Sequence, residues 1–251
     1  MTGVPRYRVP NHAMVLAAGL GVRMRPLTQN IPKPLLEVGG RTMLDQVLDR
    51  LEDAGVDHVV VNTHWLPEQI EIHLEGRLAP ETQISREDEL LETGGGIARA
   101  LPMLGYDAFY AVNADIVWRD GTIPALHRLA RAWDEETMDV LLMLTATVRA
   151  TGYDGSGDFM MDPVGKLTRR PERQIAPYVF TGVQILHPRI FEDAPSGSFS
   201  MNVLYDRALE AGRLHGMAHD GEWYHVGTPD AIKVADAEIL EKEGARVRLL
   251  F

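Results

Sequence analysis

The residues best suited to chemistry form a glycine- and arginine-rich string near the start of the chain. It reads LAAGLGVRMRPLT over residues 16–28, and PKPL follows at 32–35. Glycines that follow a strand let backbone N–H groups approach phosphate oxygens, and basic side chains supply the compensating charge. Gly19, Gly21, Arg23 and Lys33 therefore predict an anion site. A bare G-x-G would more often be an ordinary turn flanked by solvated bases.

Two common phosphate-binding motifs do not match this string. A dinucleotide-binding fingerprint needs a third glycine and a helix that starts at once, whereas Pro26, Pro32 and Pro34 exclude a continuous helix here. The Walker A sequence is also missing. The string therefore points to another type of phosphate site.

The distribution of charge supports a local anion site. The 251-residue chain has 36 acidic and 25 basic residues, a net charge of −11. Its first 36 residues hold five of the bases and no acid, so the rest carries 20 bases against 36 acids, or −16. An acidic body argues against nucleic acid or an anionic membrane surface as a partner.

Strands and helices alternate along most of the chain. Apolar and β-branched runs predict strands at 13–18, 56–62, 83–85, 108–112, 140–147, 179–186 and 223–226. Helical spacing, with Thr42 as a cap and Gly55 as a stop, predicts helices at 43–54, 67–74, from 96, 123–133, 200–211 and 229–243. This order predicts an α/β fold with a mostly parallel sheet, interrupted by a turn-rich, β-rich insertion after residue 150.

Composition excludes several classes of protein. The chain has no cysteine, which rules out disulfide scaffolds, thiolate metal sites and cysteine nucleophiles. No apolar run approaches the ~20 residues that span a bilayer. Residues 1–12 lack the apolar segment of a signal peptide, so we expect a cytoplasmic location. The sequence indicates no oligomeric state.

The glycine-rich string resembles the signature of the sugar-1-phosphate nucleotidyltransferases, which reads Gly-x-Gly-x-Arg-hydrophobic-x-Pro-Leu-Thr and then Pro-Lys-Pro. Two further blocks are similar to motifs of that family, LETGGGI at 91–97 and WYHVGTP at 223–229. The short length and the ETGGGI string are most similar to N-acetylmuramate-1-phosphate uridylyltransferases of bacterial cell-wall recycling. The resemblance covers nearly the whole chain and implies a Rossmann-like sheet flanked by helices.

The resemblance implies transfer of a nucleotidyl group from UTP to N-acetylmuramate 1-phosphate, giving UDP-N-acetylmuramate and pyrophosphate. A phosphate monoester has a second pKa near ~6, so it attacks at neutral pH without a general base. Mannose-1-phosphate guanylyltransferase, or another sugar-1-phosphate nucleotidyltransferase, remains an alternative. A non-catalytic nucleotide-sugar sensor or regulatory subunit is the alternative outside enzymes.

The family motifs assign roles to residues of this chain. The resemblance implies one domain over 1–251, with a nucleotide-binding core at 13–147, a sugar-binding part at 148–228 and a C-terminal helix and tail at 229–251. Implied catalytic residues are Arg23, Lys33 and Asp115. Implied nucleotide-binding residues are Ala18, Gly19, Gly21, Arg23, Gly95, Gly96 and Asn113. Implied sugar-binding residues are Asp158, Arg170, Thr181 and Gly182, although a hairpin turn and a strand bulge would explain most of these equally.

The implied metal site departs from the family pattern at one position. The resemblance implies Mg²⁺, or Mn²⁺, held by Asp115 and by a second aspartate, but His225 stands where that aspartate is expected. Imidazole is a poor ligand for Mg²⁺. Three interpretations stay open: Asp115 suffices, Asp220 or Glu222 replaces the missing acid, or the metal site is impaired.

Overall fold

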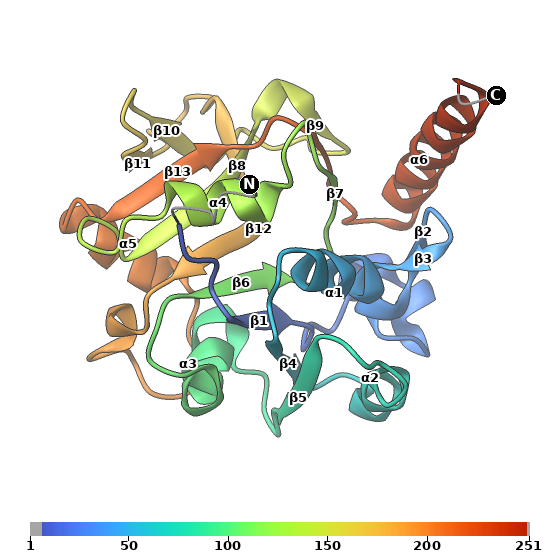
Figure 1. The fold of residues 1–251 in the computed structure, drawn as a ribbon, viewed down its shortest axis with the longest axis horizontal. Helices are drawn as coiled ribbons and strands as arrows, with labels where there is room; N and C mark the ends of the chain where they lie inside the picture. The colour runs from blue at the N-terminus through green and yellow to red at the C-terminus, as the bar shows by residue number, and fades with distance from the viewer. Residues whose placement is uncertain (1–6, 250–251) are drawn as a thin grey trace, which may run out of the picture.

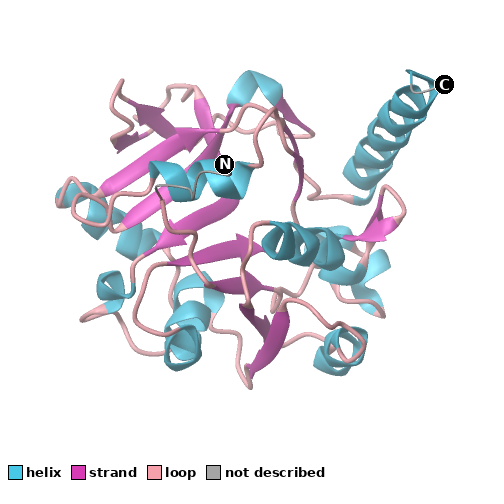
Figure 2. Cartoon of the chain, viewed as in Figure 1, coloured by secondary structure: helices cyan, strands magenta, loops and turns pink. Residues whose placement is uncertain are grey.

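A nine-stranded sheet forms the centre of the protein in the computed structural model, which describes residues 7–249 (Figures 1 and 2). Seven of its strands are hydrogen-bonded side by side in the order β11-β10-β12-β6-β1-β4-β5. The remaining two join at β12, where β8 pairs with β12 and β13 pairs with β8. The strands are β1 (His12–Leu16), β4 (His58–Thr63), β5 (Glu81–Arg86), β6 (Phe109–Asn113), β8 (Val140–Ala146), β10 (Phe159–Met161), β11 (Leu167–Arg169), β12 (Tyr178–Leu186) and β13 (Leu214–Ala218).

The sheet is mixed but mostly parallel, as the sequence predicted. β5, β4, β1 and β6 pair in parallel, and β13 pairs in parallel with β8. β12 lies antiparallel to both β6 and β8, so seven of the nine strands share one direction. Parallel strands end at the same edge of a sheet, and ligands of open α/β sheets bind at that carboxyl edge.

Helices cover both faces of the sheet, and the alternation of side chains along each strand explains why. Val15 faces the cluster beneath α1 (Met43–Asp53), α2 (Pro67–Leu74) and α4 (Ala125–Ala132), whereas neighbouring Met14 faces the cluster beneath α3 (Glu92–Leu104) and α5 (Asn202–Glu210). The Thr42 hydroxyl accepts from the Asp45 N–H and caps α1, as predicted.

The long helix α6 (Pro229–Leu249) projects at one side of the molecule, next to the hairpin β2 (Glu37–Val38)–β3 (Arg41–Thr42) (Figure 1). Ile239 and Met24 belong to one hydrophobic cluster there. The Gly39 N–H donates to the Asp236 carboxylate at 2.7 Å. A small sheet of β7 (Val117–Arg119), β14 (Glu222–Tyr224) and β9 (Ala150–Thr151) lies nearby. α6 therefore supports the back of the chain segment around residues 24–38.

Some elements differ from the sequence prediction. α3 begins at Glu92, four residues before the predicted start, because its three glycines pack inside the helix. The strand β13 was not predicted. Within residues 7–249 no helix is both long and apolar enough to cross a membrane. Residues 1–6 and 250–251 of the predicted single domain lie outside the residues that the structure describes. The predicted division of that domain into a nucleotide-binding core, a sugar-binding part and a C-terminal helix stays a prediction.

Candidate active site

Three adjoining cavities form a cleft at the carboxyl edge of the parallel strands. The loop cavity, of about 480 Å³, borders the glycine-rich string and α3. The central cavity, of about 230 Å³, shares Arg23, Lys33, Asn113 and Asp115 with it. The distal cavity, of about 350 Å³, reaches the start of α5 and adjoins both of the others. It shares Asn113, Asp158 and Phe180 with the central cavity, and Leu16, Thr93, Asn113 and Ser200 with the loop cavity. Because the three cavities are continuous, two ligands can occupy the cleft together.

The glycine-rich string is held in a fixed shape beside the loop cavity. Gly21 adopts a left-handed φ of 60°, and a Cβ there would lie 2.9 Å from the Thr28 methyl carbon. The buried Thr28 hydroxyl donates to the Gly21 carbonyl at 2.7 Å, and the Trp65 indole donates to the Thr28 carbonyl at 3.1 Å. Ala18, Gly19 and Gly21 line the cavity, and the nucleotide-binding role that the sequence assigned to them stays a prediction.

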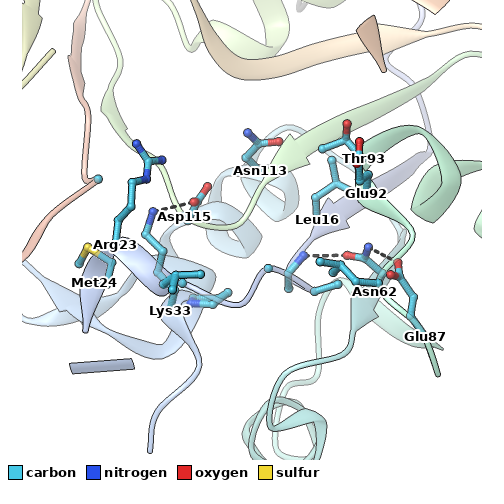
Figure 3. A pocket seen from close by; sticks show the side chains of 18 of the residues that line it. Leu16, Arg23, Met24, Lys33, Asn62, Glu87, Glu92, Thr93, Asn113 and Asp115 are labelled. Atoms are coloured by element: carbon cyan, nitrogen blue, oxygen red, sulfur yellow. Dashed lines mark hydrogen bonds and ion pairs between the residues drawn. The ribbon is translucent and has the colours of Figure 1, made fainter. Parts of the chain in front are cut away.

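Lys33 and Asp115 meet at the boundary between the loop and central cavities (Figure 3). The Lys33 Nζ lies 2.7 Å from the Asp115 Oδ2. The lysine side chain is 10% exposed and the aspartate 38%, so the carboxylate faces the cleft more than the ammonium does. Arg23 extends toward the same region, whereas Arg8 pairs with Asp107 away from it. Among the bases of the first 36 residues, Arg23 and Lys33 thus supply positive charge to the cleft.

A buried polar network beneath the loop cavity went unpredicted. The Ala17 N–H donates to Asn62 Oδ1 at 2.7 Å, and Asn62 Nδ2 donates to Glu87 Oε1 at 2.7 Å (Figure 3). The second Glu87 oxygen accepts from the Leu91 N–H at 3.0 Å. The network joins the start of the glycine-rich string to the start of α3. Its sequence signal is a polar residue near the end of the buried strand β4, Asn62, and an acid directly after the edge strand β5, Glu87.

The predicted nucleobase contacts, Gly95 and Gly96, are buried in the first turns of α3. The Gly94 and Gly95 N–H groups donate to the Phe199 carbonyl, and a Cβ on Gly95 would lie 2.3 Å from the Gly197 carbonyl oxygen. A Cβ on Gly96 would lie 2.7 Å from Glu87 Oε1. The atoms that crowd Gly95 and Gly96 therefore belong to other residues of the protein. Glu92 and Thr93 of the same motif line the loop cavity, and the nucleobase role of the glycines stays a prediction.

Three of the four predicted sugar contacts lie on the cleft. Asp158, Thr181 and Gly182 line the central cavity; Gly182 has φ 87° and sits at a break in the β12–β8 register. Arg170 is exposed and donates to the Gly157 and Gln174 carbonyls, which places it outside the three cavities. Its neighbour Arg169 lines the distal cavity instead.

His225 lies in the central cavity with Asp115. Its ring packs against Trp223 and Tyr153, with centroids 5.7 and 5.9 Å away. Burial, and then the positive charges of Lys33 and Arg23, lower the pKa of His225 below its ordinary value, so the imidazole is neutral at pH 7. Glu222 and Asp220 border a different cavity, which disfavours them as replacements for the missing acid.

The donor set fits a divalent cation that is held mainly by substrate. Asp115 offers one carboxylate on the cleft. Among the side chains that the structure describes, no group of three or more acidic, histidine or cysteine residues could hold a metal. Mg²⁺ is often bound through one or two carboxylates together with substrate phosphates. Asp115 meets that requirement, with His225 beside it as a neutral nitrogen donor.

Comparison with known proteins agrees with this geometry. A family model described as "Nucleotidyl transferase" matches residues 12–242. An N-acetylmuramate alpha-1-phosphate uridylyltransferase of Caulobacter vibrioides is 44% identical over 93% of this chain and 99% of its own. One from Neisseria meningitidis is 37% identical over 90% and 96%. The fold matches a UDP-glucose pyrophosphorylase solved with UDP-glucose, with TM-score 0.76 and 16% identity, over 92% and 99% of the chains. The chain belongs to the nucleotidyl transferase family.

Proposed function

We propose that this protein is a uridylyltransferase that makes UDP-N-acetylmuramate and pyrophosphate from UTP and N-acetylmuramate 1-phosphate. The observation that carries the proposal is the Lys33–Asp115 pair at the junction of two cavities, with the glycine-rich string on one side and the Asp158–Gly182 wall on the other. The names of the two relatives at 44% and 37% identity favour this base and sugar.

The reaction needs charge neutralisation and positioning more than proton transfer. A phosphate oxygen of the sugar 1-phosphate attacks the α-phosphorus of UTP, and the bond from that phosphorus to the β-phosphate oxygen breaks, so pyrophosphate leaves. The attacking phosphate is mostly dianionic at pH 7 because its second pKa is near ~6. Catalysis then rests on holding the two reactants in line and on neutralising the charge that they bring together.

The chain's own groups can do this work. Lys33 neutralises charge at the α-phosphate, where the two cavities meet, and Arg23 does so along the departing pyrophosphate. The backbone around Gly19 and Gly21 borders the triphosphate because the fixed loop brings it to the cavity wall. Asp115 would hold Mg²⁺, or Mn²⁺, which supplies further neutralisation of the phosphates when bound.

The setting of the reaction is part of the proposal. The resemblance found in the sequence implies a place in peptidoglycan recycling, and this role and the expected cytoplasmic location both stay predictions. A guanylyltransferase acting on mannose 1-phosphate is the less favoured alternative. A nucleotide-sugar sensor has no evident need for the Lys33–Asp115 pair.

A substrate panel tests the proposal. The purified protein is incubated with UTP or GTP, a panel of sugar 1-phosphates and Mg²⁺, and pyrophosphate release is measured. We expect the highest kcat/KM for UTP with N-acetylmuramate 1-phosphate. A preference for GTP with mannose 1-phosphate would overturn the proposed substrates, and no turnover with any pair would favour the sensor.

A further inference from the structure

The distal cavity lies beyond the residues already given a role. Arg169, Gln184, Asn202 and Tyr205 border it but not the central cavity, whereas Asp158 borders both. A sugar that lies against Asp158, with its phosphate near Lys33, can therefore direct one side of its ring into the distal cavity. The groups at that end decide which substituents the ring can carry.

Arg169 is held in place by Nε and Nη2 of its guanidinium, which leaves Nη1 as the one nitrogen without a partner among the described residues. Its Nε and Nη2 donate to the Asp206 carboxylate at 3.0 and 2.8 Å, and Nη2 also donates to Asn202 Oδ1 at 3.0 Å. The group lies over the Phe159 ring at 5.1 Å from its centroid. Nη1 has no hydrogen-bond partner within the described part of the chain. A guanidinium fixed in this way loses little freedom when it binds an anion.

The amide of Gln184 is a second hydrogen-bond donor at the distal cavity. Gln184 is 2% exposed, and its Oε1 accepts from the Tyr205 hydroxyl at 2.8 Å. Burial raises the pKa of Tyr205, so the hydroxyl stays protonated and remains the donor. The Gln184 amide nitrogen then has no partner among the residues that the structure describes, although its side chain lines the distal cavity. A buried amide nitrogen without a hydrogen-bond partner favours a ligand that brings an acceptor oxygen.

The start of α5 adds to this environment. Ser200, Met201 and Asn202 border the cavity, so the positive end of the α5 dipole faces it. The one acidic side chain that borders the cavity, among those described there, is Asp158, on the side shared with the central cavity. That carboxylate already accepts the Phe180 N–H at 2.9 Å. The far end of the cleft is therefore suited to acceptor or anionic groups.

We propose that Arg169 is a specificity-determining residue: its unpartnered Nη1 and the Gln184 amide, which border the same cavity, bind a carboxylate carried on the sugar ring. The inference rests on the proposed function, because N-acetylmuramate differs from N-acetylglucosamine by a lactyl ether that ends in a carboxylate. Charge-assisted pairing of guanidinium and carboxylate is the strong, directional contact that separates two such sugars. Arg169 is not among the sugar contacts that the sequence predicted, and the role of its neighbour Arg170 stays a prediction.

The test compares two sugar substrates in the wild type and in two variants of Arg169. kcat/KM is measured with UTP and either N-acetylmuramate 1-phosphate or N-acetylglucosamine 1-phosphate for the wild type, Arg169→Gln and Arg169→Lys. We expect Arg169→Gln to lower kcat/KM about 10–100-fold for the first sugar and less than about 3-fold for the second, the effect of one charged hydrogen bond. Arg169→Lys should give an intermediate loss, because it keeps the charge without the planar group that Asp206 and Asn202 hold in place.

Arg207→Gln is the matched control. Its guanidinium donates to the Glu192 and Asp193 carbonyls from the same helix α5, and it borders none of the three cavities, so neither substrate should be affected. An equal loss for both sugars in Arg169→Gln and Arg169→Lys would mean a structural role and overturn the inference. An unchanged ratio between the sugars would overturn it as well.

Failure of the proposed function is distinguishable from failure of this inference. If UTP is not used with either sugar, the proposed function fails, and calorimetric binding of the two sugar 1-phosphates then decides the role of Arg169. Tighter binding of N-acetylmuramate 1-phosphate by the wild type, lost in Arg169→Gln, would support the inference. Equal binding of both sugars by the wild type would refute it.

Discussion

Replacing Gly96 by alanine separates two explanations of the glycines in α3. An added Cβ would lie 2.7 Å from Glu87 Oε1 and 2.8 Å from Asn62 Nδ2, where ordinary contact begins near 3.4 Å. Neither side chain can retreat freely, because Ala17 and Leu91 hold their other ends. The substitution must therefore strain or break the 2.7 Å hydrogen bond between them.

The cost can be worked from these contacts. Overpacking costs about 1–3 kcal/mol. The hydrogen bond to a charged group contributes about 1.5–3 kcal/mol. Better helix propensity returns about 1 kcal/mol. The free energy of unfolding should thus fall by about 3 kcal/mol, within about 1.5–5 kcal/mol, which lowers the urea midpoint by roughly 1 M at an m-value near 3 kcal/mol/M.

The measurement is urea unfolding followed by tryptophan fluorescence, with Gly76→Ala as the control because nothing lies within 4 Å of a Cβ there. The control should shift the midpoint by less than about 0.2 M, as expected of a surface substitution within about 0.5 kcal/mol. If Gly96→Ala keeps the wild-type midpoint and instead raises the KM for UTP, the space beside Gly96 serves the nucleobase and the packing argument is wrong.

Other predictions concern the cleft and the acid stability of the fold. Lys33→Ala and Asp115→Ala should each lower turnover by at least ~100-fold, measured as pyrophosphate release; near-normal rates would refute their roles. His225→Asp should shift the ratio of Mg²⁺- to Mn²⁺-supported activity toward Mg²⁺, since a carboxylate suits the harder ion, and identical metal profiles would contradict this. Burial tends to raise the pKa of Asp139, but hydrogen bonds from two arginines hold it below the ordinary value. Asp139 therefore stabilises the fold above the unfolded-state pKa near ~3.9 and loses that contribution as pH falls through the lower folded-state pKa. Asp139→Asn should be less stable at pH 7 and show a flatter loss of stability below pH ~4, which acid unfolding monitored by circular dichroism can check.

The sequence predicted those parts of the structure that local patterns determine. The Thr42 cap, the apolar face of α1 and the buried strands each follow from nearby residues, and the glycine-rich string identified the loop cavity before any geometry was known. The signature residues Arg23, Lys33 and Asp115 meet because two loops end at one edge of a parallel sheet.

The remaining features depend on distant contacts. Arg169 and Arg170 are adjacent, and a strand directs neighbouring side chains to opposite sides, so pairing decides which one faces the cleft. The pairing of Phe159 with Arg169 settles this, and no local pattern shows it. β13 escaped prediction because Gly216 interrupts it; a Cβ there would lie 2.6 Å from the Leu144 side chain of the neighbouring strand.

The packing of α6 behind the glycine-rich string also has a consequence for how the protein is made. Gly39 binds Asp236, and Met24 shares a cluster with Ile239, so contacts nearly 200 residues apart complete the first loop of the cleft. Chains fold from the N-terminus as synthesis proceeds. During translation the glycine-rich segment emerges long before its support, so the cleft of the ribosome-bound chain stays incomplete until residues 229–242 have been made.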